Sequence, residues 1–268
     1  MEVNLMNRIQ TPFGGVLELY PGGDDAGDEM VLICPGGGYR FLSSREGKPV
    51  GDVFVQNGYY AAVLNYCLER QVHGTAPLRE LAWAVRWLRT DPFWKATCRK
   101  IWLAGFSAGG HLAASLGALW DEDRIFTEEE QRLNRPDGLI LGYPVISMCD
   151  FAHSGSVDRL TGGDPELIRM FSLEKQDLSN VPPVFLWNTQ SDEKVPAMNS
   201  ILFARKLTLD GVRCEYHMFH QGLHGMSLAT EEVESEEENL HPDGHIAHWM
   251  ELCLEWMKEG EHKHGDTD

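Results

Sequence analysis

The chain has 268 residues, of which 43% are hydrophobic and 24% are charged, a composition typical of a globular protein with a sizeable core. Asp and Glu outnumber Lys and Arg by 41 to 23, which gives a formal net charge of -18. A surface this acidic repels phosphate backbones and anionic lipids, so the composition argues against nucleic acids and membranes as partners.

Short apolar runs alternate with longer helical patterns along the chain. The runs are bounded by Gly or Pro and are apolar on both faces, and they occupy residues 30–34, 60–66, 100–104, 138–143, 184–187 and 214–219. Runs of this length and character predict buried strands of a parallel sheet.

Helical spacing of apolar residues is present between these runs. It predicts helices over residues 77–90, 108–120, 197–210 and 245–258. Alternating strands and helices predict one three-layer α/β domain over residues 1–268, with a mostly parallel sheet and helices on both faces. The less periodic segments 121–135 and 147–180 are interpreted as short excursions at the mouth of the site, and the acidic run 231–238 as solvated surface.

A five-residue motif connects the predicted strand 100–104 to the predicted helix 108–120. Gly105-Phe106-Ser107-Ala108-Gly109 matches G-x-S-x-G, the pattern of a nucleophile elbow, in which a sharp turn lifts a serine above the edge of a sheet. A glycine-rich connection without chemistry is the alternative. Because the motif lies between a strand and a helix, we predict that Ser107 is a nucleophile.

Three consecutive glycines, Gly36 to Gly38, follow the first predicted strand. Glycines let backbone N–H groups approach a negatively charged oxygen closely, so we predict oxyanion donors at Gly37 or Gly38 and at Ala108. A phosphate-binding loop is the competing interpretation. It is disfavoured because the loop has neither G-x-G-x-x-G nor a lysine followed by Ser or Thr.

A nucleophilic serine needs a base and an orienting carboxylate, which follow it along the chain in the order acid, then histidine. Asp192 comes shortly after the predicted strand 184–187 and is our candidate for the acid. Glu193 is the nearest substitute, and Asp150 and Asp164 also follow the serine.

The candidate base is His224, which lies in a glycine-containing segment after the last predicted strand. His220 is the minority alternative, and His217 falls within the strand itself, where it is expected to pack. His111, next to the elbow, is also expected to pack.

The histidines do not form a recognisable metal motif. His245 and His248 are spaced for one helix face, but H-E-x-x-H is absent. We therefore predict neither a metal nor another cofactor.

The six cysteines are scattered without a C-x-x-C pair, and several lie in apolar stretches, which indicates reduced, buried thiols. The first residues lack the pattern of a signal peptide, and no apolar run approaches the roughly 20 residues of a membrane helix. These features predict a cytoplasmic protein.

Six segments together resemble a known family: CPGGGYRFLSSREG, PLRELAWAVRWLR, IWLAGFSAGGHLAASLG, GLILGYPVI, PPVFLWNTQSDEKVP and HQGLHG. In this order, over roughly residues 15–257, they are similar to the acetyl xylan esterase-like α/β-hydrolases of bacteria, relatives of the hormone-sensitive lipase and feruloyl esterase groups. The resemblance implies an α/β-hydrolase fold. It also implies a catalytic triad of Ser107, Asp192 and His224, with Gly37, Gly38 and Ala108 in the oxyanion region.

The function expected from motif and resemblance is hydrolysis of short acyl esters, in particular acetyl esters, by a serine esterase. The substrate would be a small molecule or an oligosaccharide, including acetylated xylo-oligosaccharides, and Tyr39, Arg40, Tyr143 and Pro144 are candidates for the pocket. The alternatives are a small serine peptidase, a long-chain lipase and a non-catalytic binding protein of the same fold. Whether copies of the chain assemble into a homo-oligomer is left open.

Overall fold

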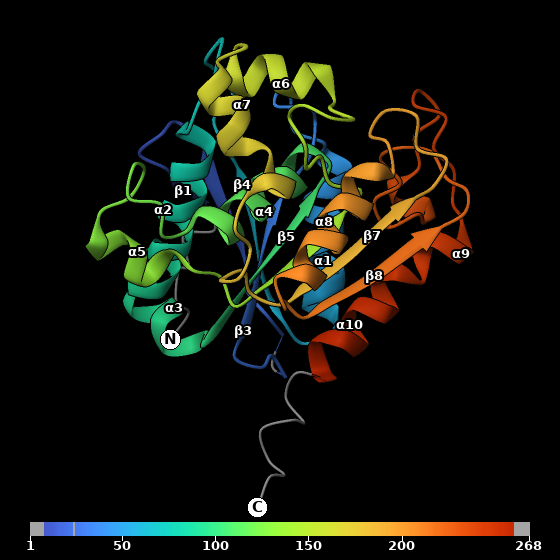
Figure 1. Ribbon diagram of the computed structural model, residues 1–268. Coiled ribbons are helices and arrows are strands. Elements are labelled where there is room, and N and C mark those ends of the chain that lie inside the picture. Colours follow the sequence, from blue (N-terminus) through green and yellow to red (C-terminus); the bar gives the residue numbers. More distant parts are fainter. Residues whose placement is uncertain (1–7, 24, 260–268) are drawn as a thin grey trace, which may run out of the picture.

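The computed structural model describes residues 8–23 and 25–259 (Figure 1). Eight strands in these residues form one sheet in the order β1-β2-β4-β3-β5-β6-β7-β8. Neighbours from β4 through β3 to β8 pair in parallel, whereas β2 pairs antiparallel with both β1 and β4. The strands are β1 (Arg8–Gln10), β2 (Val16–Tyr20), β3 (Glu29–Cys34), β4 (Tyr60–Asn65), β5 (Lys100–Phe106), β6 (Gly138–Gly142), β7 (Val184–Thr189) and β8 (Cys214–Phe219).

Helices connect the parallel strands and cover both faces of the sheet (Figure 1). They are α1 (Lys48–Gln56), α2 (Ala76–Thr90), α3 (Pro92–Thr97), α4 (Ala108–Leu119), α5 (Glu128–Asn134), α6 (Ser154–Thr161), α7 (Pro165–Phe171), α8 (Met198–Leu209), α9 (Gly244–Ala247) and α10 (Trp249–Glu259), with short 3-10 turns η1 (Ser44–Glu46), η2 (Leu173–Lys175) and η3 (Glu231–Val233).

Two apolar layers, one on each face of the sheet, form the core. Successive side chains of a strand point to opposite faces, and β3 shows this directly. Met30 and Leu32 pack in the layer that contains side chains of α2, α4 and α8. Val31 and Ile33 pack in the other layer, with side chains of α1 and α10. Because both faces are covered, the central strands are apolar throughout.

The predicted α/β fold class is confirmed, and all six predicted strands are present with ends that differ by one or two residues. The single helix predicted over residues 245–258 is wrong in detail, because the chain forms α9 and then α10, with His248 between them. The antiparallel strands β1 and β2 and the helix α1 were not predicted. Helix α1 carries Pro49 and Gly51, which obscure its pattern, and Gly51 lets it lie close to Ile33 and Ala61.

The two segments expected as excursions contain short helices. Residues 121–135 include α5, which begins with a capping box between Thr127 and Glu130. Residues 147–180 include α6, α7 and η2, and α6 and α7 lie at the top of the view in Figure 1, beyond the ends of the central strands. None of the helices in the described part of the chain is long and apolar enough to span a membrane.

Candidate active site

Ser107 lies in a strained turn between β5 and α4. Its backbone has φ 52° and ψ -119°, a conformation that side-chain-bearing residues seldom adopt. Three backbone hydrogen bonds hold the turn. The N–H of Ser107 donates to the carbonyl of Gly142 at 3.0 Å, and its carbonyl accepts from His111 at 3.0 Å and Val145 at 3.1 Å. The serine is thus fixed at the edge of the sheet, with 7% of its surface exposed.

The imidazole of His224 is within hydrogen-bond distance of this serine. Its Nε2 lies 2.8 Å from Oγ of Ser107, and its Nδ1 lies 2.6 Å from Oδ2 of Asp192. An ionised carboxylate can only accept, so Nδ1 carries the proton and donates it to Asp192. Nε2 is then left as the acceptor for the hydroxyl of Ser107. This is the tautomer that a base for the serine requires.

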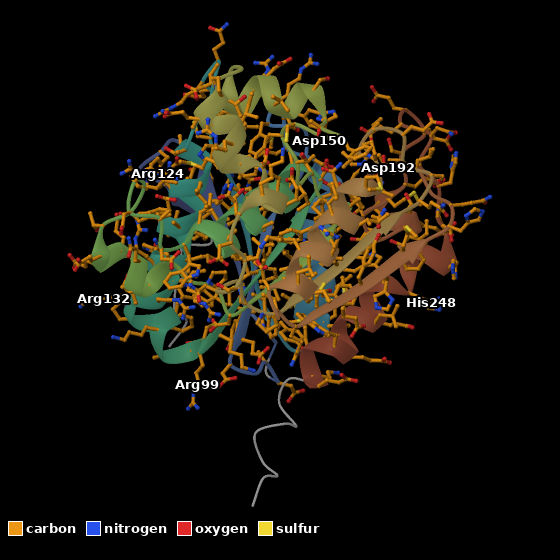
Figure 2. All side chains as sticks on the ribbon, viewed as in Figure 1. Arg99, Arg124, Arg132, Asp150, Asp192 and His248 are labelled. Carbon is orange, nitrogen blue, oxygen red and sulfur yellow. The ribbon has the colours of Figure 1, made fainter. Side chains whose placement is uncertain are left out.

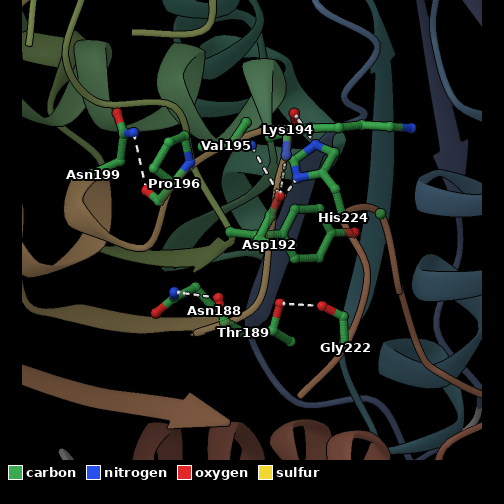
Figure 3. Close-up of polar contacts among 12 residues, drawn as sticks. Asn188, Thr189, Asp192, Lys194, Val195, Pro196, Asn199, Gly222 and His224 are labelled. Atoms are coloured by element: carbon green, nitrogen blue, oxygen red, sulfur yellow. Dashed lines mark hydrogen bonds and ion pairs between the residues drawn. The ribbon is translucent and has the colours of Figure 1, made fainter. Parts of the chain in front are cut away.

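Asp192 is held by the turn that follows β7. Its Oδ1 accepts backbone N–H groups from Lys194 and Val195, each at 2.9 Å, while Oδ2 faces His224 (Figure 3). The side chain of Asp192 is 1% exposed. Three hydrogen-bond donors around this buried carboxylate satisfy its oxygens and fix its direction.

The loops that carry Asp192 and His224 are tied to one another. The carbonyl of Gly222 accepts the hydroxyl of Thr189 at 2.9 Å, which Figure 3 shows, and that of Ser191 at 3.1 Å. Gly222 has φ 143°, and an added Cβ would lie 2.6 Å from Thr189 and from Ile246. A glycine is therefore required where the loop that carries His224 crosses the end of β7.

The glycine loop after β3 lies against the elbow. A Cβ on Gly36 would lie 2.9 Å from Cβ of Ser107, so the two backbones are in close contact. Gly37 and Gly38 adopt positive φ values of 128° and 64°. Among the described residues, the N–H groups of Gly37, Gly38 and Ala108 have no hydrogen-bond acceptor. The structure thus places three free backbone donors close to Ser107.

Glu46 is a residue of this site that the sequence interpretation missed. Its carboxylate is 3% exposed, with Oε2 accepting the N–H of Gly36 at 2.7 Å and Oε1 accepting the hydroxyl of Tyr143 at 2.7 Å. Burial raises the pKa of Glu46, while the Tyr143 and Gly36 hydrogen bonds and the nearby His224 lower it. The ring of Tyr143 lies edge-on to that of His224, with centroids 5.1 Å apart. Glu46 thereby connects the glycine loop, through Tyr143, to the ring of His224.

A cavity of about 500 Å³ opens above Ser107 and His224. Its walls come from the glycine loop, from α6, and from the loops that carry His224 and Lys194. Phe41, 55% exposed, is the one apolar side chain among the described residues that line it. The segment 147–180 therefore contributes a wall of the cavity.

His153 belongs to that wall and caps α6. Its Nδ1 accepts the backbone N–H of Ser156 at 3.2 Å, so in the neutral ring the proton is on Nε2. Burial lowers the pKa of His153, nearby His224 and Lys194 act in the same direction, and the carboxylate of Asp192 acts in the opposite one. The cavity therefore has a neutral N–H donor beside Gly38, a feature that no sequence motif indicated.

The four residues expected to line the pocket behave differently from one another. Arg40 does line the cavity. The prediction is corrected for Tyr39, Tyr143 and Pro144, which are buried in the scaffold below it. Tyr39 donates its hydroxyl to Nδ1 of His111 at 2.8 Å, Tyr143 donates to Glu46, and Pro144 packs against Gly110 of the elbow helix.

The alternative acids and bases lie apart from the serine. Glu193 is exposed, Asp164 caps α7, and Asp150 is exposed beside Lys175. His220 faces Gln190 at 3.2 Å, and His217 faces Glu215 at 2.8 Å. Among these candidates, Asp192 and His224 are the pair that the structure brings to Ser107.

His111 packs as expected, with Nε2 donating to the carbonyl of Phe171 at 2.9 Å. Burial lowers its pKa to about 4. The described residues also include a trio of exposed side chains, Glu234, Glu236 and His241, whose potential ligand atoms lie within 4.8 Å of one another. None of the three lines the cavity at Ser107, and exposed acidic groups of this kind are common without an ion.

Comparisons with known proteins agree with this fold. The BD-FAE family matches residues 18–207. Endo-1,4-beta-xylanase B of Butyrivibrio fibrisolvens is 36% identical over 216 residues, covering 78% of this chain and 34% of that protein. Acetylxylan esterase of Xylanibacter ruminicola is 30% identical over 211 residues, covering 75% of this chain and 41% of that protein. The chain thus spans between a third and a half of the length of these relatives.

Among solved structures, the chain is similar to the acetyl ester-xyloside bifunctional hydrolase from Caldicellulosiruptor lactoaceticus. The TM-score is 0.79 at 36% identity, and the match covers 92% of this chain and 89% of that one. The resemblance to acetyl xylan esterase-like proteins that the motifs indicated is thereby confirmed. With the family match extending over more than half of its length, the chain belongs to the BD-FAE family of α/β-hydrolases.

Proposed function

We propose that the chain is a serine carboxylesterase that removes short acyl groups, in particular acetyl groups, from polar alcohols such as xylo-oligosaccharides. The observation that carries this proposal is the continuous contact from Ser107 Oγ to His224 Nε2 (2.8 Å) and from His224 Nδ1 to Asp192 Oδ2 (2.6 Å). The named activities of the family relatives support the same reaction class.

In the first step, His224 accepts the hydroxyl proton as Oγ of Ser107 attacks the ester carbonyl carbon. Asp192 stabilises the resulting imidazolium and keeps the ring in place. The carbonyl oxygen becomes negatively charged in the tetrahedral intermediate. The free N–H of Ala108, together with that of Gly37 or Gly38, supplies the donors that lie about 2.7–3.1 Å from such an oxygen.

The intermediate collapses when the proton on His224 Nε2 passes to the departing alcohol oxygen, which leaves the acyl group on Ser107. A water molecule then gives its proton to His224 and attacks the acyl carbonyl. Collapse of the second intermediate releases the carboxylic acid and restores the hydroxyl of Ser107. The two steps use the same donors, because the charge develops on the same oxygen each time.

The wall of the cavity favours a polar alcohol over a long acyl chain. Apart from Phe41, the side chains that line it are polar or charged. A sugar ring can place an apolar face on the exposed ring of Phe41 and its hydroxyls against donors such as Nε2–H of His153. A long hydrocarbon chain would leave these polar groups without partners, at a cost in free energy.

A hydrolysis screen tests the proposal. Initial rates are measured on 4-nitrophenyl esters from acetyl to octanoyl and on acetylated xylo-oligosaccharides, with Ser107→Ala as the matched control. We expect the highest kcat/KM on acetyl esters and no activity in the variant. A preference for octanoyl esters would contradict the short-acyl assignment.

Two other readings of the site have separate outcomes. A small serine peptidase of this fold would cleave anilides faster than the matching esters. A binding protein without catalysis would fail to react covalently with a fluorophosphonate probe, whereas we expect labelling that is lost in Ser107→Ala.

The cellular site of action that we propose is the cytoplasm. The supporting observation is that all six cysteines are free thiols, as is usual in a reducing compartment.

A further inference from the structure

The charge on the wall of the cavity differs from that of the chain as a whole. Over the full sequence acidic residues outnumber basic ones by 41 to 23. The basic residues that line the cavity are Arg40, Arg45, Arg159 and Lys194, and the acidic ones are Glu46, Asp158 and Glu238. The wall around Ser107 is therefore slightly positive in a protein whose net charge is -18.

Some of these charged side chains already have hydrogen-bond partners within the protein. Arg45 donates from Nε to the carbonyl of Val233 at 2.6 Å and from Nη1 to that of Gly225 at 2.7 Å, and Glu238 lies 3.5 Å away. Glu46 is occupied by Tyr143 and Gly36. These groups hold the loops around the site and have little capacity left for a ligand.

Three cations remain without such a role. In the part of the chain that the structure describes, the side chains of Arg40, Arg159 and Lys194 have neither a hydrogen bond nor an ion pair, and all three are exposed. Among the described residues of the wall, Asp158 is the one carboxylate that is likewise exposed and without a side-chain hydrogen bond or ion pair. Counting only unpaired groups, the wall thus presents three positive charges and one negative charge.

These cations reach the cavity from separate elements. Arg40 follows the glycine loop, Arg159 lies in the last turn of α6, and Lys194 follows Asp192. Concave sites focus the field of charges that converge on them, and arginine can bind a carboxylate through two parallel hydrogen bonds. Convergence from three elements on the cavity of the reactive serine favours a negatively charged ligand there.

We propose that the preferred ester carries a carboxylate on its alcohol part, as an acetylated oligosaccharide with a uronic acid does, and that Arg40, Arg159 and Lys194 bind this carboxylate. The proposal rests on the esterase function argued above. The carboxylate is assigned to the alcohol part because an acetyl group carries no ionisable group. The cavity of about 500 Å³ is also much larger than an acetyl group.

The test compares two acetylated xylo-oligosaccharides that differ only in a glucuronic acid substituent. For the wild-type protein we expect kcat/KM to be roughly tenfold higher on the acidic ester, the effect of about one charge-assisted contact. The preference should shrink as NaCl rises from about 0.05 to about 0.5 M, because salt screens exposed charges.

The variants Arg40→Gln, Arg159→Gln and Lys194→Gln should each lower kcat/KM on the acidic ester several-fold and leave the neutral ester within about twofold. Arg132→Gln is the matched control. Arg132 is an exposed arginine on α5, on the opposite side of the view from Asp192 in Figure 2, and it does not line the cavity.

The outcomes separate the two proposals. If the wild-type protein cleaves neither sugar ester nor 4-nitrophenyl acetate, the esterase function is wrong. If it cleaves both sugar esters equally well, or if the variants lose the same factor on both, the carboxylate subsite is wrong and the esterase function stands. Faster cleavage of hemisuccinate esters of neutral alcohols than of their acetates would place the charge on the acyl part and would also overturn the proposal.

Discussion

The hydroxyl of Tyr143 donates a hydrogen bond of 2.7 Å to the buried carboxylate of Glu46. The same hydroxyl accepts the backbone N–H of Ser227 at 3.0 Å, three residues beyond the proposed base. The other oxygen of Glu46 holds Gly36, at the start of the glycine loop. One carboxylate thus fixes the glycine loop and, through Tyr143, the loop and ring of His224.

We predict that Glu46→Gln lowers kcat by about one to two orders of magnitude, because the amide cannot accept both hydrogen bonds and no longer carries a charge near His224. The value of KM for 4-nitrophenyl acetate should change little.

Glu80→Gln provides the control for buried carboxylates. Glu80 also accepts backbone N–H groups, from Gly15 at 3.1 Å and Cys67 at 2.8 Å, but it does not line the cavity. The Glu80→Gln variant should have a lower free energy of unfolding and an unchanged kcat and pH profile. Equal kcat values for both variants would show that Glu46 has no positioning role.

The variant Asp192→Asn tests whether Asp192 is the acid of the proposed triad. The amide favours the wrong tautomer of His224, so we expect kcat to fall by about 10³–10⁴-fold with little loss of stability. Glu193→Gln, at the exposed neighbouring position, should retain activity close to that of the wild-type protein. The reverse result would assign the acid to Glu193.

Gly109 is predicted to be essential for the contact between the elbow and the glycine loop. A Cβ there would lie 2.0 Å from the carbonyl oxygen of Cys34 and 2.4 Å from that of Pro35, neither of which can move without shifting β3. Gly109→Ala should therefore cost about 1–3 kcal/mol of unfolding free energy and most of the activity. In urea denaturation Gly244→Ala should differ little from the wild-type protein, because a Cβ at Gly244 meets no atom within 4 Å.

His111 should make stability depend on pH. Burial lowers its pKa to about 4 from the ordinary value of 6.5, so the folded state keeps the ring neutral while the unfolded state takes up a proton below pH 6.5. The stabilising contribution is complete above pH 6.5 and is lost as the pH falls toward 4, up to about 3 kcal/mol. In urea denaturation, His111→Gln should show a smaller loss between pH 7 and pH 4.5 than the wild-type protein. An identical loss would contradict this assignment.

Much of this architecture could be predicted from the sequence because the central strands are buried on both faces. An apolar run such as residues 30–34, ended by Pro35 and glycines, is typical of a central strand that is buried on both faces. The antiparallel strand β2 alternates buried and half-buried residues over only five positions, too few to distinguish it from a loop. Helix α1 was hidden by Pro49 and Gly51.

The proposed chemical groups could be assigned because their order along the chain and their places after strands are constrained by the fold. The residues that line the cavity could not be assigned from the sequence. They depend on how the long segments between strands fold over the edge of the sheet. Tyr39 and Tyr143 follow strand ends, as Ser107 does, yet both point into the scaffold. His153 caps α6 and Arg159 lies within it, and no local pattern specifies the position of this helix.

The proposed catalytic residues and the residues of the cavity wall lie on different parts of the fold. One part can vary in sequence and the other cannot. Ser107, Asp192 and His224 follow β5, β7 and β8, so any large change there disturbs the sheet. The wall made by α6 is instead an insertion between β6 and β7. A homologue could exchange that insertion for one of different length or charge and accept a different alcohol, while it retains the same three proposed catalytic residues.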